Sequence, residues 1–276
     1  MIGRRVWQTG LRAILIALAL IWSLGPIYLM YSSSFKGDDV LYQVPPAVFF
    51  TPTLEHYTRV FQSTPFFQYL WNTLVVATST TVFALIFGSL AAYSFTRFRF
   101  AGSDSLPIFY LVMRMLPRFV MVIPYYLLMR QLGLLNTHAA LIIAYTSFAL
   151  PFTIWLMIGF FKEIPIELEE AGMVDGCNRV QVFFRIVVPL VAPGLAATAI
   201  FAFLLGWNEL LFSLVLAGRD SRTLPNIAVA VTTTERGTEW GILNAMGSLV
   251  LLPVIVLALA VQRHIVKGMT MGAVKG

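Results

Sequence analysis

The sequence has few charged residues and almost no cysteine. Of its 276 residues, 12% are charged and 58% are hydrophobic, whereas a soluble domain is usually about one-quarter charged and about half apolar. This composition excludes an ordinary soluble domain. The single cysteine, Cys177, excludes an intrachain disulfide and says little about the compartment.

Residues that carry out chemistry are also scarce. The three histidines are scattered along the chain, so we expect no metal site. There is no G-x-x-x-x-G-K-[ST] loop, whose backbone N–H groups would cradle phosphates, and we therefore expect ATP to bind elsewhere. No nucleophile with a neighbouring base is evident, so we expect no catalytic residue and no enzyme activity from this chain by itself. The net charge of +6 does not indicate nucleic-acid binding, because the basic residues flank apolar runs and form no patch.

The apolar residues are concentrated in runs of about bilayer-spanning length, roughly 20 residues. Runs of this length predict helices, because backbone groups in lipid must be satisfied within the segment. We expect an all-α membrane protein with one transmembrane domain over residues 1–276. Its six predicted spans are about Leu11–Tyr31, Tyr69–Phe95, Leu106–Met129, Ala139–Phe161, Val187–Leu216 and Ile242–Val261.

Prolines fall inside or at the ends of several spans, and we expect them to kink the helices without ending them, because neighbouring helices can accommodate such kinks. They are Pro26, Pro117, Pro124, Pro151, Pro193 and Pro253.

The distribution of Lys and Arg near the span ends predicts the orientation. Eleven lie on one side and six on the other, which places both termini and the loop of residues 162–186 in the cytoplasm. A cleaved signal peptide is the alternative for the first run, but that run is long and no small-x-small cleavage site follows it.

The most ordered polar segment is the loop of residues 162–186, here named the polar loop. Pro165 suits a helix start, and Glu167, Glu169 and Glu170 would complement the helix dipole. Gly176 suits a helix end, and Asn178 suits the cap of a second helix. The sequence therefore predicts a helix, a glycine turn and another helix. On this physics alone, a docking loop and a solvated connector fit equally well.

The polar loop resembles the cytoplasmic coupling loop of ABC-transporter permeases, whose pattern is E-A-A, three residues, G, nine residues, I, one residue, L-P. Glu170, Ala171, Gly176, Ile186 and Pro189 match it. Gly172 replaces the second alanine and Val188 replaces the leucine. The resemblance implies the type I ABC importer permease fold. Its implied ATPase-coupling residues are Glu169, Glu170, Ala171, Gly172, Asp175 and Gly176.

Other segments resemble the carbohydrate-importer branch of that family. They are Asn136-Thr137, Leu150-Pro151-Phe152, Gly206-Trp207-Asn208-Glu209, and the tail from Gln262 to Gly276. The tail resembles that of the second permease subunit in maltose-type and glycerol-phosphate-type importers. The resemblance covers nearly the whole chain from the second span onward, but it does not identify the sugar.

This likeness implies a multi-pass subunit in a bacterial or archaeal cytoplasmic membrane that imports a sugar or sugar derivative. The implied partners are a second, different permease, two ATPase subunits that bind ATP and Mg, and a soluble binding protein. Lys275 and Gly276 would touch the ATPase. The binding protein would touch the polar external loop of residues 218–241 at Thr232, Thr233, Thr234 and Glu235.

Arg114 and Arg118 lie four residues apart within the third span and share a helix face. Charge inside a membrane usually faces a cavity or a partner, so both are candidates for the translocation pathway, together with Asn208 and Glu209. The alternative for the arginines is a structural or ion-paired role. Glu209 could pair with one of them, contact the binding protein, or be a plain interfacial carboxylate.

An ion-coupled secondary transporter is the alternative function. Such a protein would show paired broken helices in two matching halves and buried acidic ion sites. Glu209 is the only acidic residue within the six predicted spans, and no internal repeat is evident, so the sequence favours the ATP-driven importer.

Overall fold

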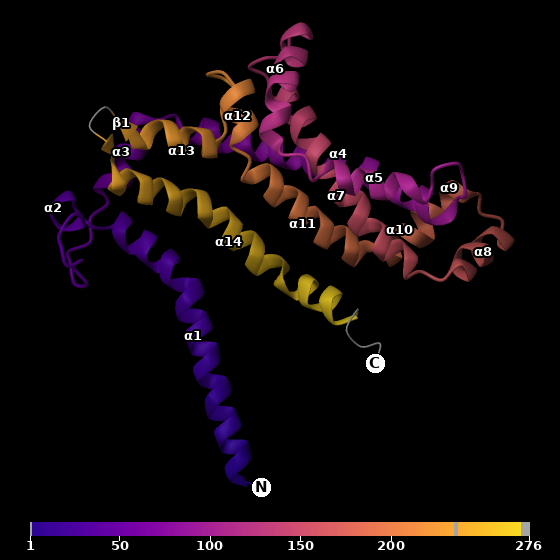
Figure 1. Cartoon of the computed structure of the whole chain (residues 1–276), viewed down its shortest axis with the longest axis horizontal. Helices are drawn as coiled ribbons and strands as arrows, with labels where there is room; N and C mark the ends of the chain where they lie inside the picture. The colour runs from indigo at the N-terminus through magenta and orange to yellow at the C-terminus, as the bar shows by residue number, and fades with distance from the viewer. Residues whose placement is uncertain (1, 235–236, 272–276) are drawn as a thin grey trace. The chain divides into compact units, whose positions relative to one another are not determined.

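The computed structural model is helical almost throughout (Figure 1). It describes the backbone of residues 2–234 and 237–271, and the side chains of residues 9–230 and 238–259. The chain divides into two compact units, each described here by itself. The smaller comprises Met1–Phe66 and Ala228–Pro253, and the larger comprises Phe67–Ile227 and Val254–Gly276.

Four helices are long and apolar enough to cross a membrane. They are α1 (Ile2–Ser34), α4 (Phe66–Arg97), α7 (His138–Lys162) and α14 (Trp240–Met271). Two bent pairs of helices also qualify, which gives up to six spans if each pair counts as one. The described strands, β1 (Thr233–Thr234) and β2 (Gly237–Thr238), form a single two-residue antiparallel pair. The predicted all-α membrane class is confirmed.

The third span is bent by 89° between α5 (Ser105–Met113) and the segment formed by η1 (Arg118–Met121) and α6 (Val122–Gln131). The expectation that Pro117 would leave this span unbroken is therefore wrong. Pro117 itself is extended, with φ −60° and ψ 129°. Proline lacks the N–H that would continue the helical ladder and disfavours helix in the residue before it.

The fifth span is also broken, because α9 (Arg179–Val182), η2 (Phe183–Val187) and α10 (Val188–Leu190) meet α11 (Ala192–Trp207) at 77°. Pro193 lies in the first turn of α11, where its missing N–H is tolerated, so it starts a helix there. The predicted end at Leu216 is also wrong: α11 ends at Trp207 and α12 (Leu211–Leu216) is separate. By contrast, Pro26, Pro151 and Pro253 lie inside continuous helices, as expected.

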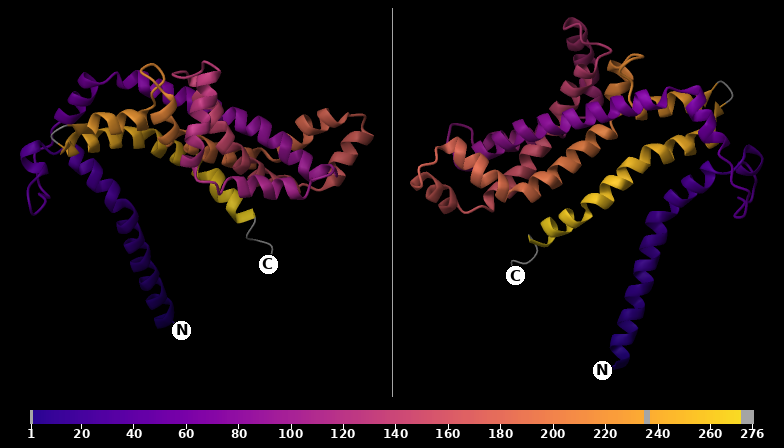
Figure 2. Two further views of the ribbon diagram at one scale, coloured as in Figure 1. Left: turned by 45° about the horizontal axis from the view of Figure 1, so that its top comes forward. Right: turned by 180° about the vertical axis from the view of Figure 1, so that it is seen from behind.

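The core of the larger unit forms around α7, which packs against α11, α5 and α12. Small residues allow close helix contact, as they commonly do in membrane bundles. A Cβ on Gly206 of α11 would lie 3.2 Å from the Cα of Ala77 on α4. Figure 1 shows α12 beside α6 at one end of this unit. In both views of Figure 2 the α8–α9 segment extends beyond the other end.

In the smaller unit, hydroxyl groups join α1, α3 (Glu55–Ser63) and the start of α14. The Tyr57 hydroxyl lies 2.7 Å from Ser34 Oγ and 2.8 Å from Ser248 Oγ. Tyr31 donates to the Ser248 carbonyl at 3.2 Å. Between α1 and α3 lies the short helix α2 (Asp38–Leu41). These bonds connect the end of α1 with α3 and with the third turn of α14.

Candidate functional site

The polar loop has the local structure that the sequence predicts. Helix α8 (Ile166–Val174) begins directly after Pro165 and carries Glu167 and Glu169 in its first turn. Gly176 follows with φ +89°, a left-handed conformation that is cheap only for glycine. Asn178 then caps α9 in a capping box with Gln181, in which each side chain accepts from the other residue's backbone N–H at 2.9 Å.

Glu169 is 5% exposed and fixes α8 to the end of α4. Its carboxylate accepts from Arg97 Nε at 2.5 Å and from the Tyr93 hydroxyl at 2.6 Å. Arg97 Nη2 also donates to the carbonyls of Phe161 and Ile164, near the end of α7, at 3.0 and 2.9 Å. Those carbonyls are among the groups that a helix end leaves without partners. One buried ion pair thus joins α4, α7 and α8.

Gly172 lies on the inner face of α8 and packs against the α9–η2 segment. It is buried, and a Cβ added there would overlap the Ile186 side chain and lie 3.4 Å from Val182 Cγ2. The family resemblance implied Gly172 as an ATPase-coupling residue. In the structure its small size accommodates the chain's own Ile186.

The outer face of α8 is exposed and partly apolar. Val174, at the tip of the polar loop, is 87% exposed, and Met173 is 37% exposed. Glu170, Ala171 and Asp175 are also exposed. Near the start of α8, Ile166 and Leu168 are 49% and 44% exposed. A loop this polar would ordinarily have few such side chains facing water, and contiguous exposed apolar surface is typical of a binding site.

A second site lies where η1, directly after the bend of the third span, meets the segment between α11 and α12. Arg118, on η1, donates through Nη1 to Glu209 Oε2 at 2.6 Å. Glu209 lies between α11 and α12, and its other oxygen accepts from the backbone N–H of Phe212 at 3.0 Å. The Glu209 side chain is 7% exposed and that of Arg118 is 41% exposed. Of the roles that the sequence left open for Glu209, the structure shows the pairing with an arginine.

Arg114 contacts an aromatic ring, whereas Arg118 forms an ion pair. Its guanidinium lies 4.3 Å from the centre of the Phe152 ring, a favourable cation–π geometry, and it makes no ion pair within the part of the chain whose side chains are described. Both arginines and Asn208 line a cavity of about 300 Å³, here named the arginine pocket. Its other lining residues are Phe152, Phe201, Leu204 and Leu205.

The remaining sequence candidates cannot be placed with side chains. The backbone of Thr232, Thr233 and Thr234 lies at the end of α13 (Leu224–Thr232) and in β1. Their side chains, together with Glu235, Lys275 and Gly276, lie outside the described residues. Among residues 9–230 and 238–259, no group of three His, Cys, Asp or Glu side chains is placed to hold a metal ion.

Sequence reasoning missed Tyr93 and Arg97 as the partners of Glu169. Arg97 is the basic residue in the last turn of α4, which is the one signal the sequence offered. A basic residue at a span end is usually read only as an orientation marker, and nothing in the sequence connects it to a carboxylate 72 residues away.

Comparison with known proteins identifies relatives along the whole chain. Residues 84–271 match the family described as binding-protein-dependent transport system inner membrane component. The chain is 36% identical over 274 residues to the diacetylchitobiose uptake system permease protein DasC of Streptomyces coelicolor, covering 99% of this chain and 98% of that protein. It is 34% identical over 268 residues to the trehalose/maltose transport system permease protein MalG of Thermococcus litoralis, covering 96% and 95%.

Solved structures share the fold. A chain of a bacterial ABC transporter that imports the acidic polysaccharide alginate superposes with a TM-score of 0.76 at 24% identity, covering 95% of this chain and 97% of that one. A chain of the MetNI methionine ABC transporter superposes with a TM-score of 0.58 at 19% identity, covering 72% and 93%. The protein therefore belongs to the inner-membrane components of binding-protein-dependent transport systems, as an ABC-importer permease with multiple membrane-spanning helices.

Proposed function

We propose that this permease passes a sugar or a sugar derivative from a soluble binding protein into the cytoplasm, driven by separate ATPase subunits. The observation that carries the proposal is the exposed apolar tip of the polar loop around Met173 and Val174. Apolar side chains on a loop that otherwise suits water are explained by burial against another protein. The partner is the ATPase. Because this sequence has no phosphate loop, we assign the binding of ATP and Mg to that subunit.

Within the polar loop, two sets of residues have different tasks. Glu170, Ala171, Val174 and Asp175, which are exposed, contact the ATPase. The buried Glu169 and Gly172 act indirectly, because they hold α8 against Arg97 of α4 and Ile186 of η2.

The same contacts couple the ATPase to the membrane helices. Because α8 is fixed to α4, α7 and η2, a displacement of α8 moves these elements together. η2 continues through α10 to α11, which ends at the arginine pocket. When the ATPase closes, these helices would rotate together as a rigid body and so change the surroundings of the arginine pocket, which is a recognised class of transition.

The translocation pathway runs past the arginine pocket, where Arg114, Arg118, Asn208 and Glu209 lie together. Guanidinium and amide groups hydrogen-bond hydroxyl-rich molecules, and Phe152 and Phe201 offer apolar faces. The sugar assignment rests on the relatives, whose names include uptake systems for diacetylchitobiose, trehalose and maltose.

On the other side of the membrane, the segment of residues 218–241 is the contact for the binding protein, with Thr232, Thr233, Thr234 and Glu235 as its central residues. Lys275 and Gly276 add a second contact with the ATPase. The complete importer contains a second, different permease and two ATPase subunits in a bacterial or archaeal cytoplasmic membrane. An ion gradient plays no part in this scheme.

Co-purification with the ATPase tests the proposal. Val174→Asp places a carboxylate on the apolar tip, where burying an unpaired charge against the partner costs more than about 1.4 kcal/mol. We expect ATPase binding to weaken at least about tenfold, while the midpoint of thermal unfolding stays unchanged because Val174 is 87% exposed. Val48→Asp is the matched control, since Val48 is 71% exposed on the predicted external side. Normal ATPase binding by Val174→Asp would contradict the docking assignment.

A further inference from the structure

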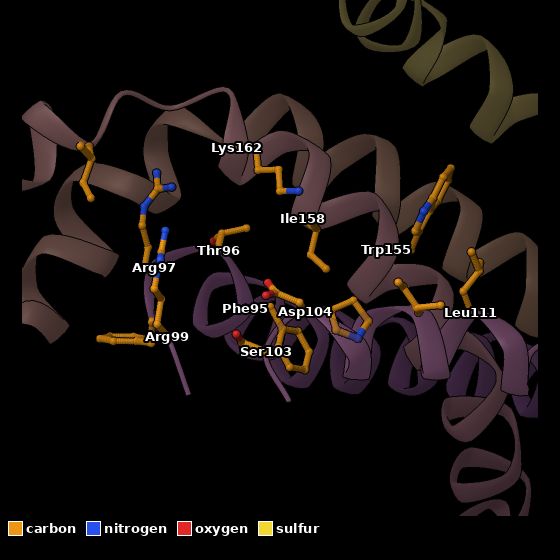
Figure 3. Close-up of a pocket in the computed structure, with 14 residues that line it drawn as sticks. Phe95, Thr96, Arg97, Arg99, Ser103, Asp104, Leu111, Trp155, Ile158 and Lys162 are labelled. Atoms are coloured by element: carbon orange, nitrogen blue, oxygen red, sulfur yellow. The ribbon is translucent and has the colours of Figure 1, made fainter. Parts of the chain in front are cut away.

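A second cavity of the larger unit has a composition unlike that of the arginine pocket. It has a volume of about 690 Å³ and lies where the end of α4, the start of α5 and the last turns of α7 meet. We name it the basic pocket. In Figure 3, Arg97 and Arg99 lie at one end of it and Trp155 and Leu111 at the other, while Lys162, Ile158 and Trp155 follow one another along α7.

The charges at one end of the basic pocket are not balanced. Arg97 is neutralised by Glu169. Arg99 and Lys162 form no ion pair among the residues whose side chains are described, and Asp104 is the one carboxylate in the lining. Two available cations therefore face one anion, so an anionic ligand is favoured over a neutral or cationic one.

The other end of the basic pocket is apolar. Trp155, Ile158, Ile108 and Leu111 line it, and Trp155, Ile108 and Leu111 are 51%, 63% and 38% exposed. Lys162 and Trp155 are seven residues apart on one helix, which corresponds to about 10 Å along its axis. A ligand that fills the pocket therefore needs an anionic head and an apolar part about 10 Å long or more. Inorganic phosphate supplies only the first.

The predicted orientation puts the cationic end at the cytoplasmic surface of the membrane, because Lys162 is the last residue of α7 and the polar loop follows it. Anionic lipids give the cytoplasmic leaflet its negative surface potential, and basic pockets between membrane helices on this side bind anionic head groups. The N-terminal residues Arg4 and Arg5 and the tail residues Lys267 and Lys275 have the same sign as the pocket, so the chain's own ends are poor occupants.

We propose that the basic pocket binds one anionic phospholipid, with its phosphate between Arg99 and Lys162 and an acyl chain along Trp155 and Leu111. The bound lipid would join the α4–α5 turn to the end of α7. Ile166 of α8 also lines the pocket, so the lipid would brace the base of the polar loop.

The test is quenching of Trp155 fluorescence by brominated phosphatidylglycerol in the purified, detergent-solubilised importer. The signal of the Trp155→Phe importer is subtracted, which isolates the contribution of Trp155 from those of the other tryptophans. We expect saturable quenching. Each basic residue near an anionic surface is worth about 1 kcal/mol, so Arg99→Gln or Lys162→Gln should weaken the affinity about fivefold and the double variant roughly 25-fold.

Three arms separate the alternatives. Brominated phosphatidylcholine with the same acyl chains should quench Trp155 far less, and sn-glycerol 3-phosphate should not displace the brominated phosphatidylglycerol. Arg185→Gln removes an exposed cation of η2 outside the pocket and should leave the affinity unchanged. Leu111→Phe keeps both cations but fills the apolar end, and it should weaken binding even if the double variant fails to assemble.

Equal quenching by the two lipids would overturn the proposal, as would displacement by glycerol phosphate, which would indicate a site for a free anion. If Arg185→Gln weakened the lipid affinity as much as Arg99→Gln or Lys162→Gln, the attraction would come from the general surface charge and not from the basic pocket. Absence of any Trp155 quenching would also overturn the proposal, because a brominated acyl chain lying along Trp155 must quench that residue. None of these outcomes bears on ATPase docking at Val174, so the lipid site and the transport function can fail independently.

Discussion

Arg118 and Glu209 are 91 residues apart in the sequence and form an ion pair that joins η1 to the segment between α11 and α12. Arg118 begins η1, directly after Pro117, and Glu209 follows the end of α11. The Glu209 carboxylate also accepts the backbone N–H of Phe212 near the start of α12. One side chain therefore accepts a backbone N–H near the start of α12 and also pairs with Arg118.

This arrangement predicts strong coupling between the two residues. Arg118→Gln and Glu209→Gln should each lower the apparent midpoint of thermal unfolding, and the double variant should be less destabilised than the sum of the two. The coupling energy should be roughly 0.5–3 kcal/mol, the range for groups in one network. It should lie nearer the lower end because Arg118 is 41% exposed. Additive effects in a double-mutant cycle would show that the pair contributes nothing.

Arg114 is the sharper probe of the translocation pathway, because its substitution breaks no ion pair within the described side chains. Arg114→Lys keeps the charge but loses the planar fork of donors, and Arg114→Gln loses the charge. A lost hydrogen bond costs about 0.5–1.5 kcal/mol, so both variants should slow uptake of the delivered sugar by roughly two- to tenfold. Assembly with the ATPase should persist. Arg130→Gln, an exposed change at the end of α6, is the control, and full uptake by Arg114→Gln would exclude the pathway role.

Gly172 and Ile186 should also be coupled. Gly172→Ala gains about 1 kcal/mol of helix propensity, but the new methyl overlaps the far end of Ile186, and an off-rotamer isoleucine costs about 0.5–1.5 kcal/mol. The single change should therefore be nearly neutral. In an Ile186→Val background, which lacks the overlapping atom, the same change should stabilise by about 1 kcal/mol in thermal unfolding. An equal effect of Gly172→Ala in both backgrounds would contradict this packing.

The backbone conformation and hydrogen bonds of Asn136 predict the order of thermal stability of its glycine and alanine variants. It has φ 60°, and its side chain donates to Asp220 Oδ2 at 3.0 Å and accepts from Asp220 N and Ser221 Oγ at 3.3 and 3.1 Å. Asn136→Gly loses these bonds but keeps the conformation. Asn136→Ala also forces a residue with a Cβ into the left-handed region, at about 1–2 kcal/mol. The unfolding midpoint should fall from Asn136 to Gly to Ala, and an alanine variant as stable as the glycine variant would contradict this account.

The sequence predicted the elements that local chemistry controls. The helix–glycine–helix form of the polar loop and the cap at Asn178 are found in the structure, and four of the six apolar runs form single long helices. It could not predict the bends at Pro117 and Pro193, because prolines such as Pro151 are accommodated within a continuous helix elsewhere in the same chain. Whether a span bends depends on what neighbouring helices offer the freed backbone groups.

Contacts between distant segments were the other missing part. The family resemblance implied Glu169 as an ATPase-coupling residue, while the structure buries it against Tyr93 and Arg97. The same limit applied to Glu209, for which pairing with an arginine was one of three roles that the sequence left open. Charge pairing over 70 to 90 residues requires the packing of the bundle, which no local pattern contains.

The burial of Glu169 separates two kinds of selection on one short helix. Glu169 forms a buried ion pair with Arg97 of the same chain. Removing either partner would leave a buried charge unpaired and would lower the free energy of unfolding by about 3–5 kcal/mol. Glu170, Met173 and Val174 are exposed, so their substitution leaves no charge of the chain buried and unpaired. During evolution, a permease of this kind can therefore adapt to a different ATPase subunit through substitutions at the exposed residues of α8 alone. Residues 97 and 169 are expected to change together or to remain fixed.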